Sequence, residues 1–497
     1  GDGTAEVRDA VHDGYGVHSS LIGHDLHGLV VGPDRRLYFS IGDRGFHVEH
    51  EGRTHAYPDE GAVLRCELDG SGLEVVHRGL RNPQELAFDA HGDLFTGDNN
   101  SDGGDRARLV QIVAGADSGW RIGFQWLDDR GAWNRERMWQ PRQPGQTATT
   151  LPPIANFADG PSGLAFDPGV GLPERFRGCF FLCDFRGGAS YSGVHAIRLQ
   201  RAGAGYELAS ADKVVWNVLA TDVDFGPDGA MYVLDWVSGW NKTGKGRIYR
   251  VRTPGMANDM QLRAGAQLLA ADLKPKGEAA LVALLAHADR RVRQEAQFAL
   301  VDLGARDALL AAAKNKAGRQ ARLHGLFGLG ILGRKDKAAL DGVAALLDDG
   351  DADVRAIAAR VLGDCRRADA VGALTKRLSD GSGRVQREAA LALARLGAAA
   401  EPATAALVDL LRQNDDRDAV LRHAASYALA EAAKPDALAA AAGDGSRAVR
   451  LGALLALARR GDAEVARFLT DADPDLRADA ASVIHDTPIP AALLALA

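Results

Sequence analysis

The stretch that decides the fold covers residues 223–235 and reads VDFGPDGAMYVLD. Two apolar runs flank a Gly-Pro-Asp-Gly turn, which is typical of two short antiparallel strands joined by a tight turn. The same strand–turn–strand pattern occurs upstream over residues 29–43, 86–98 and 164–184, and the copies start roughly 55–80 residues apart. Further β-like segments between the copies would add outer strands. Four-stranded units at this period predict the blades of a β-propeller.

A break in composition separates this region from the rest of the chain. All seven Trp lie at or before Trp240, whereas the sequence beyond residue 255 is rich in Ala, Leu, Arg and Asp. Units such as DRRVR at 289–293 and DADVR at 351–355 recur about every 27–36 residues, each with two amphipathic segments and an acidic turn. This predicts a HEAT-like α-solenoid of about seven repeats, with in-phase Asp and Arg forming a polar ladder. We therefore expect a propeller over residues 1–255 and a solenoid over 256–497.

Charge and cysteine content narrow the possible partners. The 497-residue chain has 59 Lys and Arg against 66 Asp and Glu, a formal net charge of −7, which argues against nucleic acid as the main partner. No apolar run reaches 18 residues, so we expect no membrane span. Four Cys in so long a chain do not make a disulfide framework. The chain begins Gly-Asp-Gly, without Met or a signal peptide, which suggests a processed chain or a fragment.

Each of the four repeated patterns ends in an aspartate, at Asp43, Asp98, Asp184 and Asp235. Equivalent strand ends of a propeller lie at the same height around its axis, so several carboxylates would converge near one mouth of the channel. Converging carboxylates suit a hard cation such as Ca²⁺ or a polar cofactor held by one. The alternative is that each Asp caps backbone N–H groups of its own turn.

Three further motifs carry candidate chemistry. The run DNNSDGGD at 98–105 is the densest set of oxygen ligands in the chain and predicts either a cation loop or an Asx-rich turn without a ligand. His24 and His27 precede the first complete blade, where a histidine is either a general base or an ordinary surface residue. The tetrapeptide RNPQ at 81–84 combines an Arg that can bind a carboxylate with side-chain amides that can hydrogen-bond to carbonyl groups.

Taken together, His24, GPD at 32–34, RNPQ at 81–84, GGD at 103–105 and TDV at 221–223 resemble the soluble glucose/sorbosone dehydrogenase family. The closer likeness is to secreted bacterial propeller–HEAT proteins. The resemblance implies a six-bladed propeller that oxidises a sugar or aldose with pyrroloquinoline quinone (PQQ) and Ca²⁺ and passes electrons to an external cytochrome. It also implies a periplasmic or secreted location. Relatives carry about two more blades ahead of the four visible here.

The resemblance also assigns roles to residues. His24 falls on the family's base position, with His27 as a close competitor, and Asp43 would steady the imidazole. Hydride would pass to the quinone while the base removes the proton of the sugar C1 hydroxyl. The predicted site is, as a set, His24, His27 and Asp43 for catalysis, Arg81, Asn82 and Gln84 for the cofactor, and Asp98, Asn99 and Asp105 for the metal.

Two departures from the family pattern keep other functions open. Thr221 stands where the family has an Arg, and the Trp expected shortly before residue 161 is absent, with Phe157 nearby. The main hypothesis is a PQQ-dependent sugar dehydrogenase acting on a carbohydrate. The alternative is a non-catalytic scaffold or binding protein whose solenoid docks a protein partner, or whose ring another chain completes. A third reading is non-redox chemistry on carbohydrate.

Overall fold

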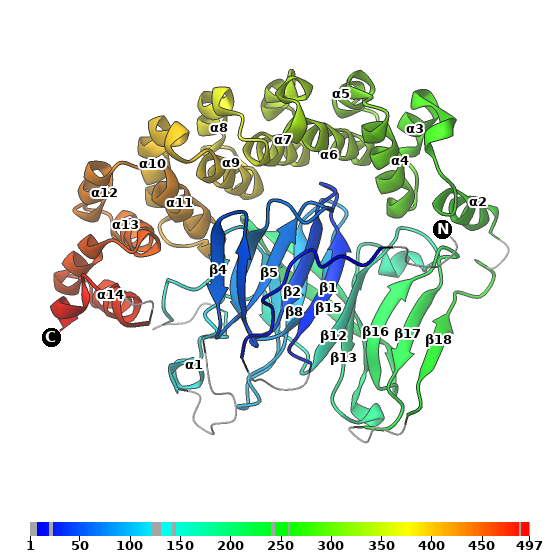
Figure 1. Cartoon of the computed structure of the whole chain (residues 1–497), viewed down its shortest axis with the longest axis horizontal. Coiled ribbons are helices and arrows are strands. Elements are labelled where there is room, and N and C mark those ends of the chain that lie inside the picture. The colour runs from blue at the N-terminus through cyan, green and yellow to red at the C-terminus, as the bar shows by residue number, and fades with distance from the viewer. Residues whose placement is uncertain are drawn as a thin grey trace.

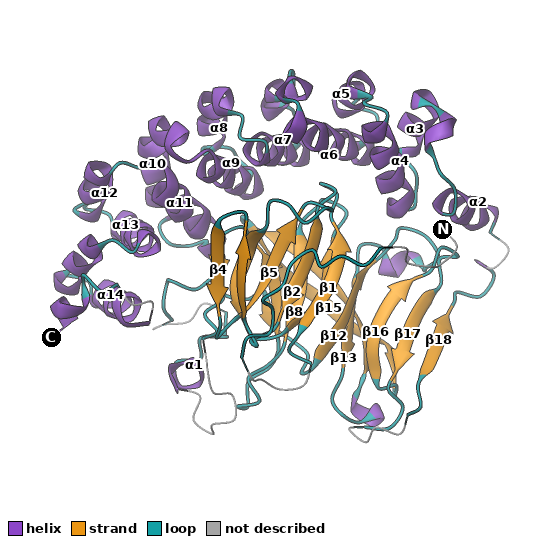
Figure 2. Ribbon diagram, in the orientation of Figure 1, coloured by secondary structure: helices purple, strands orange, loops and turns teal. Residues whose placement is uncertain are grey.

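The computed structural model of the chain describes residues 7–18, 23–121, 131–141, 146–239, 244–256, 259–486 and 489–496. Strands occupy the N-terminal half and helices the C-terminal half, and the helices form an arch over one end of the strands (Figures 1 and 2). The last strand ends at Val251 and the first solenoid helix begins at Met260. The predicted order, a propeller-type domain followed by a helical solenoid, is confirmed.

The strands form four sheets and a separate hairpin, β3 (Phe46–His50) with β4 (Arg53–Tyr57). The first sheet has the order β1 (Leu26–Val31), β2 (Leu37–Ile41), β5 (Gly61–Cys66), β6 (Glu74–Leu80) and β10 (Ala116–Asp117). The second has β11 (Ala155–Asn156), β9 (Arg108–Ile112), β8 (Leu94–Asp98) and β7 (Pro83–Phe88). The third has β12 (Pro161–Phe166), β13 (Phe180–Asp184), β14 (Gly193–Ala202) and β15 (Gly205–Trp216). The fourth has β16 (Ala220–Phe225), β17 (Met231–Asp235) and β18 (Arg247–Val251).

The sheets are arranged as propeller blades are, with their first strands side by side. β7 lies between β1 and β12, and β12 lies next to β16. Among the described strands the first and fourth sheets do not meet, so the sheets do not close into a ring. The number of blades in a complete ring stays a prediction.

Aromatic side chains pack each sheet against the next. Tyr38 meets Phe88 between the first and second sheets, with ring centroids 5.0 Å apart. The rings of Phe95 and Phe180 lie 4.9 Å apart between the second and third sheets, and those of Phe181 and Phe225 lie 5.3 Å apart between the third and fourth. All three pairs are edge-on, a favourable geometry for buried rings. This packing explains why the aromatic residues concentrate in the first half of the chain.

Thirteen helices are described in the second half of the chain, beside several short 3₁₀ segments. The helices are α2 (Met260–Leu269), α3 (Glu278–Leu284), α4 (Arg290–Asp302), α5 (Arg306–Lys314), α6 (Arg319–Lys335), α7 (Ala352–Asp364), α8 (Val371–Arg377), α9 (Gly383–Leu396), α10 (Thr404–Asn414), α11 (Ala419–Ala432), α12 (Pro435–Ala442), α13 (Arg447–Arg460) and α14 (Pro474–Asp486). A further short helix, α1 (Gly131–Arg135), belongs to the strand-rich half. The stretch Gly383–Asn414, which spans α9 and α10, has the length and apolar composition to cross a membrane. Helices in the core of a protein can share these two properties.

The helices pack as a HEAT-like solenoid. Helices α4, α6, α7, α9, α11 and α13 follow one another along the inner side of the arch and face the sheets (Figure 1). Arg–Asp pairs connect successive repeats, as Arg355 with Asp380 at 2.8 Å and Arg450 with Asp471 at 2.8 Å. These pairs form the polar ladder that the in-phase Asp and Arg predict.

The inner helices also bind the turns of all four sheets. The Gln297 amide donates to the carbonyl of Pro33 in the first sheet at 2.7 Å, and the Arg290 guanidinium donates to that of Phe88 in the second at 2.6 Å. The backbone N–H of Arg290 donates to Pro168 in the third sheet, and Arg291 donates to Phe225 in the fourth. Carbonyl groups at sheet ends lack ladder partners, so donors from the solenoid supply the missing hydrogen bonds.

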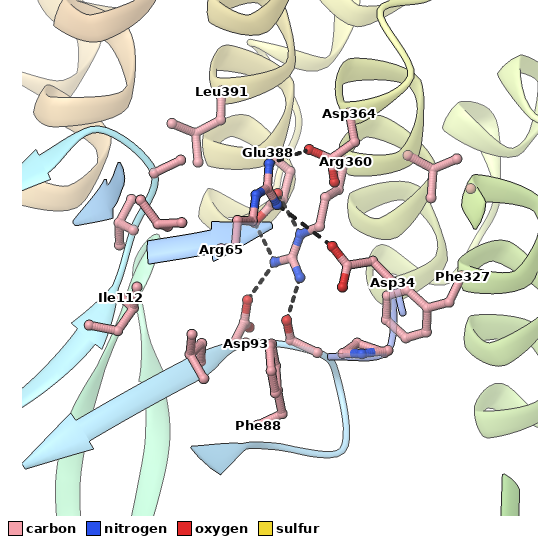
Figure 3. A pocket seen from close by; sticks show the side chains of 18 of the residues that line it. Asp34, Arg65, Phe88, Asp93, Ile112, Phe327, Arg360, Asp364, Glu388 and Leu391 are labelled. Atoms are coloured by element: carbon pink, nitrogen blue, oxygen red, sulfur yellow. Dashed lines mark hydrogen bonds and ion pairs between the residues drawn. The ribbon is translucent and has the colours of Figure 1, made fainter. Parts of the chain in front are cut away.

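Asp93, in the turn of the second sheet, is the centre of this interface (Figure 3). Its buried carboxylate accepts hydrogen bonds from Arg360 at 2.6 Å and Arg387 at 2.9 Å, and from Arg384 at 3.2 Å. Burial opposes ionisation, but the three guanidinium groups outweigh it and hold the pKa of Asp93 well below its usual value. The Tyr206 hydroxyl from the third sheet donates to the same carboxylate at 2.6 Å. A cavity of about 100 Å³ borders this cluster.

We predict that Arg387→Met lowers the free energy of unfolding by about 3–5 kcal/mol, because removing one partner of a buried ionic cluster leaves the other charges uncompensated. Urea unfolding followed by circular dichroism measures it. The control is Arg412→Met, which removes an exposed guanidinium paired with Asp409 and Asp444 and should leave the free energy of unfolding close to that of the wild type. Equal losses in the two variants would contradict a central role for the Asp93 cluster.

Candidate functional site

Three of the four strand-end aspartates cap the backbone of their own sheet. The carboxylates of Asp98, Asp184 and Asp235 accept N–H groups from the residues that lead into the first strand of the same sheet. The donors are the amides of Arg81 and Asn82 for Asp98, those of Asp159 and Gly160 for Asp184, and that of Leu219 for Asp235. At these positions the geometry is the turn capping that the sequence left as the alternative.

Asp43 differs from the other three aspartates because it binds the side chains of a histidine and a tryptophan. The His24 Nδ1 lies 2.7 Å from Asp43 Oδ1, and the Trp120 indole N–H donates to Asp43 Oδ2 at 2.8 Å. All three side chains are buried. When Nδ1 carries the proton that Asp43 accepts, Nε2 keeps a lone pair and can act as a base. The predicted pairing of His24 with Asp43 is thus present in the structure.

His27, the competing histidine, has a different partner. Its Nε2 lies 2.7 Å from the carbonyl oxygen of Gly23, which only an N–H can satisfy, so Nε2 carries a proton. Burial lowers the pKa of the His27 imidazole. The amide of Gln84 also donates to the Gly23 carbonyl, at 3.4 Å. His27 and Gln84 therefore hold the segment that leads to His24.

Arg81 and Asn82 lie beside the His24 pair. The Arg81 side chain is 1% exposed, and its guanidinium lies 5.6 Å from the centroid of the Trp120 ring. It donates from Nη2 to Asp102 at 2.6 Å and from Nη1 to the carbonyl of Asn100. Trp120 thus contacts both Asp43 of the His24–Asp43 pair and Arg81, the residue predicted to bind the cofactor.

Several buried polar atoms at this site have no hydrogen-bond partner among the described residues. They include both amide atoms of Asn82, the Nε of Arg81 and the hydroxyl of Ser40. A Cβ at Gly42 would lie 2.7 Å from the Asn82 amide oxygen and 2.7 Å from the carbonyl oxygen of His24, so the glycine keeps this space open. Buried polar groups are almost always satisfied, and unsatisfied ones are costly. The arrangement fits a polar ligand bound beside Asn82 and His24.

The predicted metal loop is held by its own hydrogen bonds. The buried carboxylate of Asp98 pairs with Arg108, whose Nε lies 3.0 Å away. Asp105 accepts from the backbone N–H of Ser101 at 2.8 Å and from its hydroxyl at 2.6 Å. The Asn99 amide oxygen accepts the N–H of the next residue. In this arrangement the two carboxylates do not present the donor set that Ca²⁺ prefers.

Within the described residues no group of three or more His, Cys, Asp or Glu could hold a metal ion. The Ca²⁺ roles of Asp98, Asn99 and Asp105 therefore stay predictions. Backbone carbonyl groups would have to contribute ligands.

Two residues of the site escaped the sequence reasoning. Trp120 lies in the SGWR stretch at 118–121, where nothing in the local sequence links its indole N–H to Asp43. Arg108 neutralises Asp98 from the neighbouring strand of the same sheet. Pairing the two strands so that Arg108 lies opposite Asp98 would have predicted this contact, because cross-strand pairs of opposite charge stabilise a sheet.

Comparisons with known proteins agree with this architecture. Residues 17–245 match the glucose/sorbosone dehydrogenase family, and residues 340–430 match HEAT repeats. Quinoprotein glucose dehydrogenase B from Acinetobacter calcoaceticus is 32% identical over 137 residues, which cover 22% of this chain and 28% of the relative. The activity of the whole relative is therefore a proposal for this chain.

Solved structures resemble parts of the chain. The PQQ-bound aldose sugar dehydrogenase of Streptomyces coelicolor is 21% identical, with a TM-score of 0.30, over 46% of this chain and 62% of that one. A HEAT-like repeats protein of Thermococcus onnurineus is 16% identical, with a TM-score of 0.27, over 36% and 78%. Scores this low carry no argument. From the matched residues, the N-terminal half of this chain is a glucose/sorbosone dehydrogenase domain, homologous to quinoprotein glucose dehydrogenase, and HEAT repeats follow it.

Proposed function

We propose that this chain is a PQQ-dependent dehydrogenase that oxidises a sugar or another aldose at the site built around His24. The observation that carries the proposal is the His24–Asp43–Trp120 chain of hydrogen bonds beside the unpartnered amide of Asn82. An oriented base next to unsatisfied polar groups is the arrangement expected where a polar cofactor and a hydroxyl substrate meet.

In this proposal each residue has a definite task. His24 Nε2 accepts the proton of the substrate hydroxyl, and the Asp43 carboxylate stabilises the imidazolium that forms. Trp120 keeps Asp43 in place through its indole N–H. Arg81, Asn82 and Gln84 would hold the quinone's carboxylate and carbonyl groups. PQQ, when bound, supplies the two-electron acceptor for the hydride.

The remaining parts of the proposal rest on the family resemblance. Ca²⁺ would bind at the 98–105 loop, an external cytochrome would take the electrons, and the protein would work in the periplasm or outside the cell. A ring of six blades would need strands beyond the four sheets described here.

A second function has an observation in its favour. Apolar side chains are exposed on the fourth sheet, at the open side of the propeller. Ile248 of β18 is 70% exposed, and Leu234, which lies opposite it on β17, and Trp236 are also exposed. Exposed apolar side chains at the edge of a sheet are a site for protein partners. A propeller that has no catalytic activity and whose ring another chain completes would bind that chain through this surface.

Titration calorimetry with PQQ in excess Ca²⁺ separates the two functions. We expect saturable binding near one PQQ per chain, with affinity lowered at least tenfold in Asn82→Ala, because the buried amide loses its ligand contacts. A repeat after chelation of Ca²⁺ tests the metal. No binding by a chain with the native circular dichroism spectrum would overturn the dehydrogenase proposal and favour the scaffold.

The assignment of the base predicts different effects for the two histidines. His24→Gln should lower kcat by about 10²–10⁴-fold, because general-base catalysis contributes that much. His27→Gln should keep most of the activity, because His27 binds a backbone carbonyl. Steady-state rates with a dye acceptor and a panel of aldoses measure both. The opposite ranking would move the base to His27.

The role of Trp120 predicts a loss of activity. Trp120→Phe keeps a buried ring but removes the N–H that binds Asp43, so the carboxylate is held less precisely against His24. We expect kcat at neutral pH to fall about tenfold, measured as steady-state rates with a dye acceptor. The control is Trp139→Phe in the same aromatic cluster, which should keep the wild-type kcat. An unchanged kcat in Trp120→Phe would limit Trp120 to packing.

A further inference from the structure

The guanidinium of Arg81 is buried, yet part of its charge is balanced by a residue at the surface. The Arg81 side chain is 1% exposed, whereas the side chain of its partner Asp102 is 53% exposed. The two are joined by a single hydrogen bond of 2.6 Å, from Arg81 Nη2 to Asp102 Oδ2. Asp102 therefore reaches inward from the tip of the 98–105 loop to a cation that belongs to the site.

The side chain of Asp102 and the backbone of its loop are held by different contacts. Asp98 pairs with Arg108, and Asp105 binds Ser101. The N–H groups of Asp102 and Gly103 donate to the Asn100 amide oxygen and the Ser101 hydroxyl. The Asp102 carboxylate binds Arg81 instead, so a rotation of this side chain can release Arg81 while the loop backbone keeps its hydrogen bonds.

Other polar atoms of Arg81 and of its neighbour Asn82 lack hydrogen-bond partners among the described residues. Arg81 Nε and both amide atoms of Asn82 are buried without a hydrogen-bond partner among the described residues, although Asp102 lies close enough to bind Nη2. The protein thus supplies hydrogen-bond acceptors for Nη1 and Nη2 of Arg81 but no partners for Arg81 Nε and the Asn82 amide. A ligand carboxylate could accept hydrogen bonds from Arg81 Nε and Asn82 Nδ2 together, because a guanidinium donates two parallel hydrogen bonds to a carboxylate, while Asn82 Oδ1 would need a donor on the ligand.

We infer that Asp102 is an internal competitor, a carboxylate that occupies Arg81 until a carboxylate of the cofactor displaces it. The inference rests on the proposed function and adds a control of cofactor affinity to it. Binding then exchanges one Arg–carboxylate pair for another and releases the Asp102 carboxylate to solvent. Because the buried guanidinium stays paired with a carboxylate before and after the exchange, the exchange costs the incoming ligand only a modest part of its affinity.

PQQ titrations of three chains test the inference. Asp102→Asn removes the competing charge but keeps a side chain that tolerates positive φ, so PQQ should bind about three- to tenfold more tightly than to the wild type. The control Asp69→Asn removes an exposed carboxylate of another turn, between β5 and β6, and should leave the affinity unchanged. Thermal unfolding of each chain confirms that the variants are folded.

The outcomes separate this inference from the function on which it rests. Equal affinity in the wild type and Asp102→Asn would overturn the competition while keeping the PQQ site. Weaker binding in Asp102→Asn would also overturn it and would make Asp102 a ligand or an organiser of the loop. Failure of all three folded chains to bind PQQ would overturn the proposed function and the inference with it.

Discussion

The structure depends on one buried carboxylate, Asp93, held between guanidinium groups of two solenoid helices. Arg360 comes from α7, and Arg384 and Arg387 come from α9, so a single turn of the second sheet fixes the position of two successive repeats. The cluster is favourable only when all its members meet, because an isolated buried charge is strongly disfavoured. Its charges therefore make the placement of the solenoid on the sheets specific as well as stable.

At the opposite ends of the sheets, carboxylates bind backbone N–H groups. The candidate site lies at Asp43, the strand-end aspartate that binds the side chains of His24 and Trp120. Asp98, Asp184 and Asp235 bind backbone N–H groups, which repeats the same local solution in three sheets. Asp43 has the same place in the repeat but binds side chains of His24 and Trp120. In a repetitive fold, chemistry is gained where one copy exchanges a structural hydrogen bond for one with a reactive group.

The sequence predicts the local parts of this structure better than the long-range ones. The strands around GPD at 32–34 and GPDG at 226–229 follow from turn chemistry and apolar runs, and the helices follow from their periodicity. The His24–Asp43 pairing was predicted only through a family resemblance. Trp120 and Asp43 are 77 residues apart in the sequence, and Arg387 and Asp93 are 294 apart. No local sequence pattern therefore indicates either contact.

The metal loop shows why residue type alone is a poor guide to a ligand set. Asp98 and Asp105 are good Ca²⁺ ligands by chemistry, but Arg108 and Ser101 already use their oxygens. These contacts fix both ends of the loop and leave Asp102 at the tip with its bond to Arg81. The candidate site thus combines a buried part, His24 with Asp43 and Trp120, and a half-exposed side chain, Asp102, that binds Arg81. Precise alignment of a base and exchange of a bound cofactor place opposite demands on rigidity, and in the proposed function this division of the site would meet both.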